Sequence, residues 1–211
     1  MHLRNTPKSV RMLLALVLLV GALALAACSS SSQTSSSSST SSTTAPTGTT
    51  AKDLLPKAMS ELSTAAPDGK LLVCQSFQPI TTTSTPGWEY LVGSPKSGKV
   101  YAVLIMGGKT QFMEYGTAGL SPDQWTQIPS VDEWKIDSDV AHEKALTVYP
   151  QGKNAAYYPG FVTYVPKNQQ NSNNVPMTWY VRFDPSSRGN AATDTVLVDM
   201  RTGAARLATS K

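Results

Sequence analysis

The chain has 211 residues, with 18 Lys and Arg against 14 Asp and Glu, and only two cysteines. Three of the basic residues lie in the first 27, so the rest of the chain carries 15 basic and 14 acidic side chains. Such a balance leaves no basic field to attract nucleic acid, and that class of partner is excluded.

Residues 1–27 have the pattern of a secretory signal peptide. A basic segment precedes an apolar run from Met12 to Ala27, which is too short to span a bilayer comfortably. The end of this run, Leu25-Ala26-Ala27-Cys28, resembles the lipobox of bacterial lipoproteins. The resemblance implies cleavage before Cys28, attachment of diacylglycerol to its thiol, and a lipid anchor on the extracytoplasmic face of the cell membrane. The alternative is an uncleaved membrane anchor with a chance cysteine.

Residues 28–50 are expected to form a disordered linker behind the lipidated cysteine. From Ser29 to Thr50, 18 of 22 residues are Ser or Thr, and such a segment buries too little apolar surface to offset its ordering entropy. A flexible coil of this length spans roughly 25 Å on average. The linker would therefore hold the body off the membrane, and its Ser and Thr residues leave O-glycosylation open.

The body, 51–211, contains all 16 Phe, Trp and Tyr residues and is predicted to form two successive helix-plus-sheet units. In the first unit, 51–130, apolar residues recur at helical spacing over 52–65. Alternating or continuous apolar runs then predict four strands, at 71–77, 88–93, 99–106 and 111–115. The run at 99–106 is apolar almost throughout and is expected to be a central strand.

The second unit, 131–211, repeats this order of elements after an irregular linker. A helix is expected over 138–149, with Asp137, Ser138 and Asp139 as candidate N-caps. Four strands follow, at 160–166, 176–183, 194–200 and 204–208, with an exposed loop at 168–174. In the second of these strands one face is apolar, through Met177, Trp179, Val181 and Phe183. A helix followed by a run of strands, twice over, predicts an α+β fold with antiparallel sheet, although no repeat of individual residues is evident.

The second unit, from about Trp134 to Leu207, resembles the PepSY pattern of secreted bacterial proteins. The resemblance rests on IDSDVAHEKAL (136–146), on the strand TWYVRF, and on the closing hairpin TVLVDMRTGAARL (195–207). It implies a PepSY- or cystatin-like topology and a non-catalytic module, which in some members modulates a peptidase.

The hairpin also has a purely structural interpretation. Gly203 follows Thr202 where a three-residue turn would need a positive φ. Asp199 can accept hydrogen bonds from the backbone N–H groups of that turn. We therefore expect Asp199, Thr202 and Gly203 to shape the turn and not to bind a ligand.

Two apparent motifs fail on inspection, so no metal or cofactor is predicted. MGGKT (106–110) lacks the first glycine of a phosphate-binding loop, since Val103 stands there, and Gly107-Gly108 is expected to be a hairpin turn. HEKAL (142–146) has Leu146 where a zinc-protease helix needs its second histidine. His142 is expected to be a half-exposed helix residue.

Cys74 is the other candidate for chemistry, because it remains after Cys28 is assigned to the lipid. A nucleophilic cysteine needs a nearby base, and His142 is the sole histidine available for that role in the body. A buried cysteine that packs as a small apolar residue is the favoured interpretation.

Three functions remain open. The leading hypothesis is a membrane-anchored, non-catalytic module that binds a peptide, protein or envelope component. The alternatives are a hydrolase or transferase that uses Cys74, and a structural spacer or assembly protein of the cell envelope. Tyr157 and Tyr158 are the candidate ligand contacts, because strand alternation must turn one of the two outward.

Overall fold

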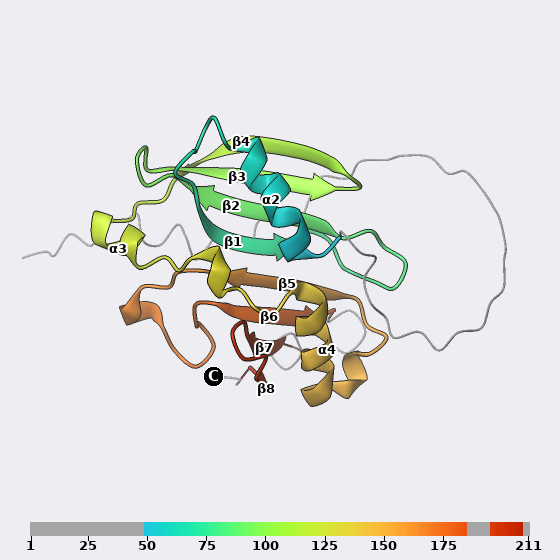
Figure 1. The fold of residues 1–211 in the computed structure, drawn as a ribbon. Helices are drawn as coiled ribbons and strands as arrows, with labels where there is room; N and C mark the ends of the chain where they lie inside the picture. The colour runs from blue at the N-terminus through green and yellow to red at the C-terminus, as the bar shows by residue number, and fades with distance from the viewer. Residues whose placement is uncertain (1–48, 185–194, 209–211) are drawn as a thin grey trace, which may run out of the picture. The chain divides into compact units, whose positions relative to one another are not determined.

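A helix followed by four strands occurs twice, and all eight strands form one antiparallel sheet (Figure 1). The structure is a computed structural model that describes residues 49–184 and 195–208. The first set comprises α2 (Ala51–Glu61), β1 (Lys70–Ser76), β2 (Gly87–Gly93), β3 (Lys99–Met106) and β4 (Lys109–Thr117). The second comprises α4 (Ser138–Val148), β5 (Tyr157–Val162), β6 (Thr178–Phe183), β7 (Thr195–Asp199) and β8 (Ala205–Leu207). The predicted α+β class with antiparallel sheet is confirmed.

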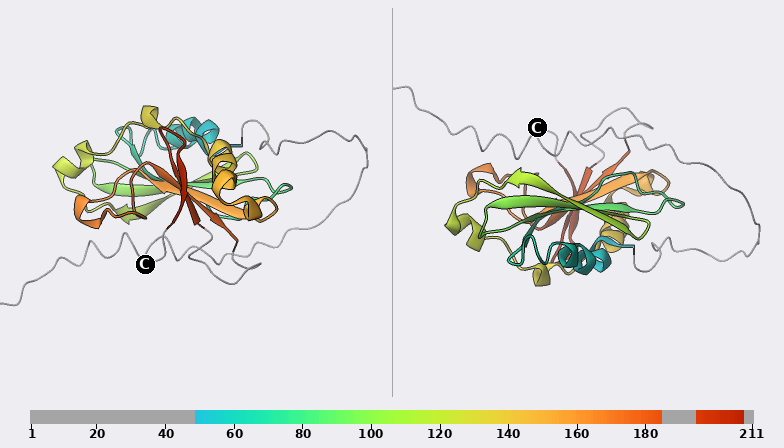
Figure 2. Two further views of the ribbon diagram at one scale, coloured as in Figure 1. Left: turned by 90° about the horizontal axis from the view of Figure 1, so that it is seen from below. Right: turned by 90° about the horizontal axis from the view of Figure 1, so that it is seen from above.

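The two sets meet at the middle of the sheet. The strand order is β4-β3-β2-β1-β5-β6-β7-β8, so the first strand of each set pairs with the first strand of the other. From this central pair each set runs outward to its own edge, and the sheet twists strongly along the way (Figure 2). Both halves therefore share one sheet within a single compact unit, Ala45–Lys211.

One chain separation recurs between the starts of the two helices and between two residues paired at the centre of the sheet. Ala51 and Ser138, the first residues of α2 and α4, are 87 positions apart. The same separation divides Cys74 from Phe161, which face each other across the central strand pair. The helices also have the same length, 11 residues. The number of residues between the two helix starts is therefore also the number between these two paired residues of β1 and β5.

A tryptophan on the second strand of each half ties that strand to its helix in the same way. Trp88 on β2 donates its indole N–H to the carbonyl of Thr49 at 2.8 Å, and Trp179 on β6 donates to Ile136 at 2.8 Å. Each acceptor is the residue before the N-cap of the helix in that half. The indole therefore fixes how the chain enters each helix.

Helices α2 and α4 lie on the same side of the sheet (Figure 2). Between them and the strands the aromatic rings pack edge to face, with centroids 5.8 Å apart for Trp134 and Trp179 and 4.8 Å for Phe161 and Trp179. These contacts belong to one core cluster that takes residues from both halves. As predicted, the alternate residues Met177, Trp179, Val181 and Phe183 are all buried.

The N-termini of the two helices are joined by hydrogen bonds. Asp137 caps α4 by accepting from the N–H of Ser138, and the same carboxylate oxygen accepts from the N–H of Lys52 in α2 at 3.0 Å. The hydroxyl of Ser138 accepts from the N–H of Ala51 at 3.1 Å. Because one carboxylate serves both helices, the start of α2 is held against the second half.

The segment between the halves is more ordered than the sequence predicts. It contains α3 (Pro122–Thr126) and a short 3-10 turn, η2 (Val131–Glu133). A capping box between Ser121 and Gln124 starts α3. The indole of Trp125 lies against Gly93, where an added Cβ would come within 2.5 Å of the ring. Trp125 thereby anchors this segment on the face of the sheet opposite α2 and α4. A further 3-10 turn, η4 (Lys167–Gln169), lies in the predicted loop before β6.

Candidate functional site

The candidate site lies on the face of the sheet opposite α2 and α4, here called the open face. The pairing registers place one continuous row of residues across all eight strands of this face. From β4 to β8 the row reads Gln111, Leu104, Glu89, Gln75, Gly160, Tyr180, Leu197 and Arg206. Polar and charged groups thus stand in the middle of a sheet face, between apolar neighbours.

The segment around α3 covers one end of the open face. Trp125 and Ile128 pack there with Leu72, Val73 and Val100 in a second, smaller apolar cluster. This cluster is separate from the core beneath α2 and α4. The row that contains Glu89 is not among the buried members of either cluster.

Glu89 is the most unusual residue of this row. It is only 4% exposed, and its Oε2 accepts a hydrogen bond of 2.5 Å from Nε2 of Gln75 on the neighbouring strand. Within residues 49–184 and 195–208 no Lys, Arg or His forms an ion pair with it, since the two ion pairs found there involve Glu114 and Glu133. A buried carboxylate without a cation is costly, so Glu89 calls for an explanation.

Aromatic side chains lie on both sides of Glu89 along the open face. The ring of Phe77 lies over Gly87, where an added Cβ would come within 2.5 Å of it. Burial, and secondarily the charge of Glu89, raise the pKa of Tyr115. The phenol of Tyr115 is therefore within electrostatic range of the carboxylate.

In the second half the open face carries Tyr158, Tyr180 and Arg182. The guanidinium of Arg182 lies over the ring of Tyr158, 4.9 Å from its centroid. The hydroxyl of Tyr180 accepts from the N–H of Val175 at 2.9 Å and lies 3.2 Å from the carbonyl oxygen of the same residue. The hydroxyl of Tyr180 and the guanidinium of Arg182 thus both make contacts within the second half.

The predicted pair Tyr157 and Tyr158 is divided between the two faces, as strand alternation requires. Tyr158 is half-buried on the open face, whereas Tyr157 is 9% exposed and lies in the core. The ring of Tyr157 stacks on that of His142, with centroids 3.7 Å apart and an interplanar angle of 1°. Of the two, Tyr158 is the one that stays partly exposed, and its contact with a ligand stays a prediction.

The expectation of a half-exposed His142 is wrong. His142 is 8% exposed, and its Nε2 has no hydrogen-bond partner among the described residues. Burial lowers its pKa from 6.5 to about 4. His142 lies on the buried face of α4, at helical spacing with Ser138, Ala141 and Ala145, and the small residues of that face do not mark it clearly as apolar in the sequence.

Cys74 lies at the centre of the sheet and is completely buried. Burial raises the pKa of its thiol well above the usual value, and the charges of Asp137 and Glu89 add to this. Its sulfur makes no hydrogen bond within residues 49–184 and 195–208. An inaccessible, protonated thiol without a base is a poor nucleophile, and the environment is that of a small apolar core residue.

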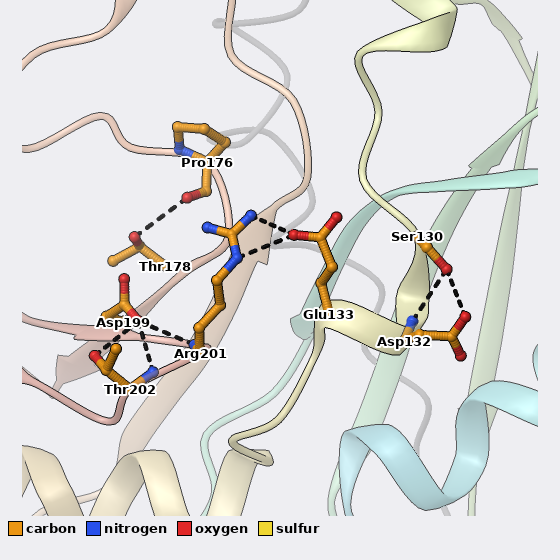
Figure 3. A network of polar contacts seen from close by, with 8 residues as sticks. All are labelled: Ser130, Asp132, Glu133, Pro176, Thr178, Asp199, Arg201 and Thr202. Carbon is orange, nitrogen blue, oxygen red and sulfur yellow. Dashed lines mark hydrogen bonds and ion pairs between the residues drawn. The ribbon is translucent and has the colours of Figure 1, made fainter.

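The residues of the final hairpin shape its turn, as Figure 3 shows. Asp199 Oδ1 accepts hydrogen bonds from the N–H groups of Arg201 and Thr202, at 3.0 and 2.7 Å, and from the Thr202 hydroxyl at 2.8 Å. Gly203 has the positive φ, +74°, that the sequence predicts. The turn has four residues, 200–203, and not three, because the Asp199 N–H donates to the carbonyl of Ala204.

The same turn is linked to the segment between the halves. The guanidinium of Arg201 donates from Nε and Nη2 to Oε2 of Glu133, at 3.0 and 2.5 Å (Figure 3). Both side chains are about half exposed, so this ion pair contributes little to stability. It connects the turn of the hairpin to η2.

Three other predictions concern the Gly107-Gly108 turn, metal binding and the segments before the body. Gly107 and Gly108 form a two-residue hairpin turn with φ of +55° and +79°. In the part of the chain that the structure describes, no group of three or more His, Cys, Asp and Glu side chains could hold a metal ion. The signal peptide, Cys28 and nearly all of the Ser/Thr-rich linker lie outside the described residues.

None of the helices in residues 49–184 and 195–208 has the length and apolar character that crossing a membrane would take.

Comparison of the chain with protein-family models, with curated proteins and with solved structures finds no match.

Proposed function

We propose that the protein is a lipoprotein, anchored through Cys28 on the extracytoplasmic face of the cell membrane, whose body binds a peptide, protein or envelope component without catalysing a reaction. The observation that carries the proposal is the row of side chains on the open face. A sheet face that served only as solvated surface would not need an almost fully buried carboxylate. Partly exposed apolar and aromatic neighbours on the same face favour contact with a partner.

A PepSY- or cystatin-like origin of the halves is part of this proposal. Each half has a helix followed by antiparallel strands, and the second closes with a hairpin whose turn is formed by Asp199, Thr202 and Gly203. A module of this type would act by binding, for example as the modulator of a peptidase. The buried environment of Cys74 gives the enzyme alternative no support.

The proposal is tested by site-specific photo-cross-linking of the full-length protein in cells. A photoreactive amino acid replaces Met113 or Tyr158 on the open face, and replaces Val148 on α4 as the control. Met113 and Val148 are both solvent-accessible, at 44% and 36% exposure. We expect discrete cross-linked products from the two open-face positions and none from Val148.

The same products from all three positions would reflect non-specific proximity and contradict the proposal. Products from Val148 alone would move the binding surface to the helical side of the sheet. If no position gives a product, the protein is better described as a spacer.

A further inference from the structure

Glu89 is not required by the architecture of the sheet. In the second half the equivalent position, two residues into the paired segment of the second strand, is Tyr180, as the tryptophans next to both residues show. Tyr180 satisfies its hydroxyl with Val175 of its own half. The same place in the fold therefore accepts an uncharged residue, and the carboxylate of Glu89 has another reason to be there.

Among the described residues, one side chain donates a hydrogen bond to the Glu89 carboxylate. Gln75 donates to Oε2, and no described residue donates to Oε1. One amide hydrogen of Gln75 is used in this hydrogen bond, and the amide oxygen of Gln75 can still accept another. The two residues are paired on β1 and β2, so they bring two acceptor groups, one of them charged, to neighbouring strands, and neither group forms an ion pair within the described residues.

The side chains around these oxygens are apolar or aromatic. Leu104 lies directly opposite Glu89 on β3, and Leu91 is the next residue of β2 on the same face. The Phe77 ring covers Gly87 on the other side. Such a setting fits a ligand with an aliphatic stem and a cationic end, since the stem packs on the leucines and the cation meets the carboxylate and the ring.

We infer that Glu89 and Gln75 form a binding site for a basic side chain, Lys or Arg, presented by a partner polypeptide. The inference rests on the proposed function and names the chemistry that the open face would recognise. The Glu89 carboxylate forms no ion pair within the described residues, so it favours a positively charged group on the partner. Small ligands usually bind in enclosing pockets. Glu89 and Gln75 lie instead on a sheet face, where neighbouring side chains leave only shallow depressions. We therefore favour a polypeptide over a small amine.

The test measures binding of short model peptides to the purified full-length protein in detergent micelles. The peptides have an alanine framework and a central Lys, Arg, norleucine or Glu, and n-butylammonium chloride serves as the small-amine probe. We expect the Lys and Arg peptides to bind at low ionic strength and the norleucine and Glu peptides to bind at least about tenfold more weakly. The n-butylammonium ion should also bind more weakly than the Lys peptide.

Glu89→Gln removes the charge and keeps the shape, so that an amide pair with Gln75 remains. We expect this variant to lose at least about tenfold in affinity for the basic peptides and to unfold at a temperature no lower than the parent. Glu114→Gln is the matched control, because Glu114 is a carboxylate of the same sheet that pairs with Lys99 at the surface. It should bind the peptides as the parent does.

Equal binding of the Lys and norleucine peptides, unchanged affinity in Glu89→Gln, or no binding of any basic peptide would each overturn the inference. Binding of n-butylammonium as tight as that of the Lys peptide would assign the site to small amines and overturn the choice of a polypeptide. Cross-linking from Met113 and Tyr158 that persists in Glu89→Gln cells would leave the proposed function standing while this inference fails.

Discussion

His142 has in α4 the place that Leu55 has in α2, four residues after the first residue of the helix. Both residues are buried, so the second half accommodates an imidazole where the first half has an aliphatic side chain. Stacking on Tyr157 satisfies the faces of the ring, but protonation would put a charge in the core. Burial therefore lowers the pKa of His142 from 6.5 to about 4.

This lowered pKa predicts a loss of stability in mild acid. Above pH 6.5 the histidine is neutral in both states, and below that value the unfolded chain gains a proton that the folded protein does not accept until about pH 4. The free energy of unfolding should therefore fall between these limits, by about 3 kcal/mol in total for this one group. In His142→Leu, which copies the first half, this part of the pH dependence should be absent.

Urea unfolding of both proteins across the same pH range measures the difference. The carboxylates titrate in both proteins, so their contribution cancels in the comparison. Parallel stability curves for the parent and the variant would show that His142 is not held neutral in the core.

At the scale of single elements, the β7–β8 hairpin depends on the backbone conformation of one residue. Gly203 has φ of +74°, and an added Cβ would meet the side chains of Ile136 and Lys144 at 3.5 Å, an ordinary contact distance. The cost of a larger residue here thus comes from the backbone and not from crowding. A residue that tolerates the left-handed region should be accepted.

Gly203→Val should therefore lower the free energy of unfolding by more than about 1 kcal/mol, because a β-branched residue is poorly tolerated at positive φ. Gly203→Asn is the matched control, since asparagine adopts this conformation more readily, and it should lose clearly less. Thermal or urea unfolding of the two variants distinguishes them. Equal losses would mean that side-chain size, and not the backbone, decides stability at this position.

At the scale of the whole molecule, the sequence predicts the elements better than their arrangement. Alternation and helical spacing depend on which face is buried, so the faces of β6 and the position of Cys74 follow from local pattern. The pairing of β1 with β5 does not, because it joins residues far apart in the chain. The order of the strands, and with it the row on the open face, is a property of the complete sheet.

The candidate site was missed for the same reason. In the strand sequence WEYLVG, Glu89 occupies an alternate position that normally faces solvent, and nothing nearby in the chain indicates that it is 4% exposed. Its neighbours Gln75 and Leu104 come from other strands. Helix α3 was missed because five residues are too few to show helical periodicity, although its capping box is a readable signal.

The membrane anchor is the prediction that concerns the whole chain, and it rests on the sequence before the body. If Cys28 carries the acyl chains, then Cys28→Ala removes the membrane affinity that several acyl chains provide together. We expect the variant to move from the detergent phase to the aqueous phase in phase partitioning, and to leave the membrane fraction of fractionated cells. Ser30→Ala, a change close by that leaves the lipobox resemblance intact, should partition as the parent does.

Because the body would keep its fold, the purified Cys28→Ala protein should still bind the basic peptides, which separates the role of the anchor from that of the open face. Unchanged detergent partitioning of Cys28→Ala would show that this cysteine is not the point of attachment.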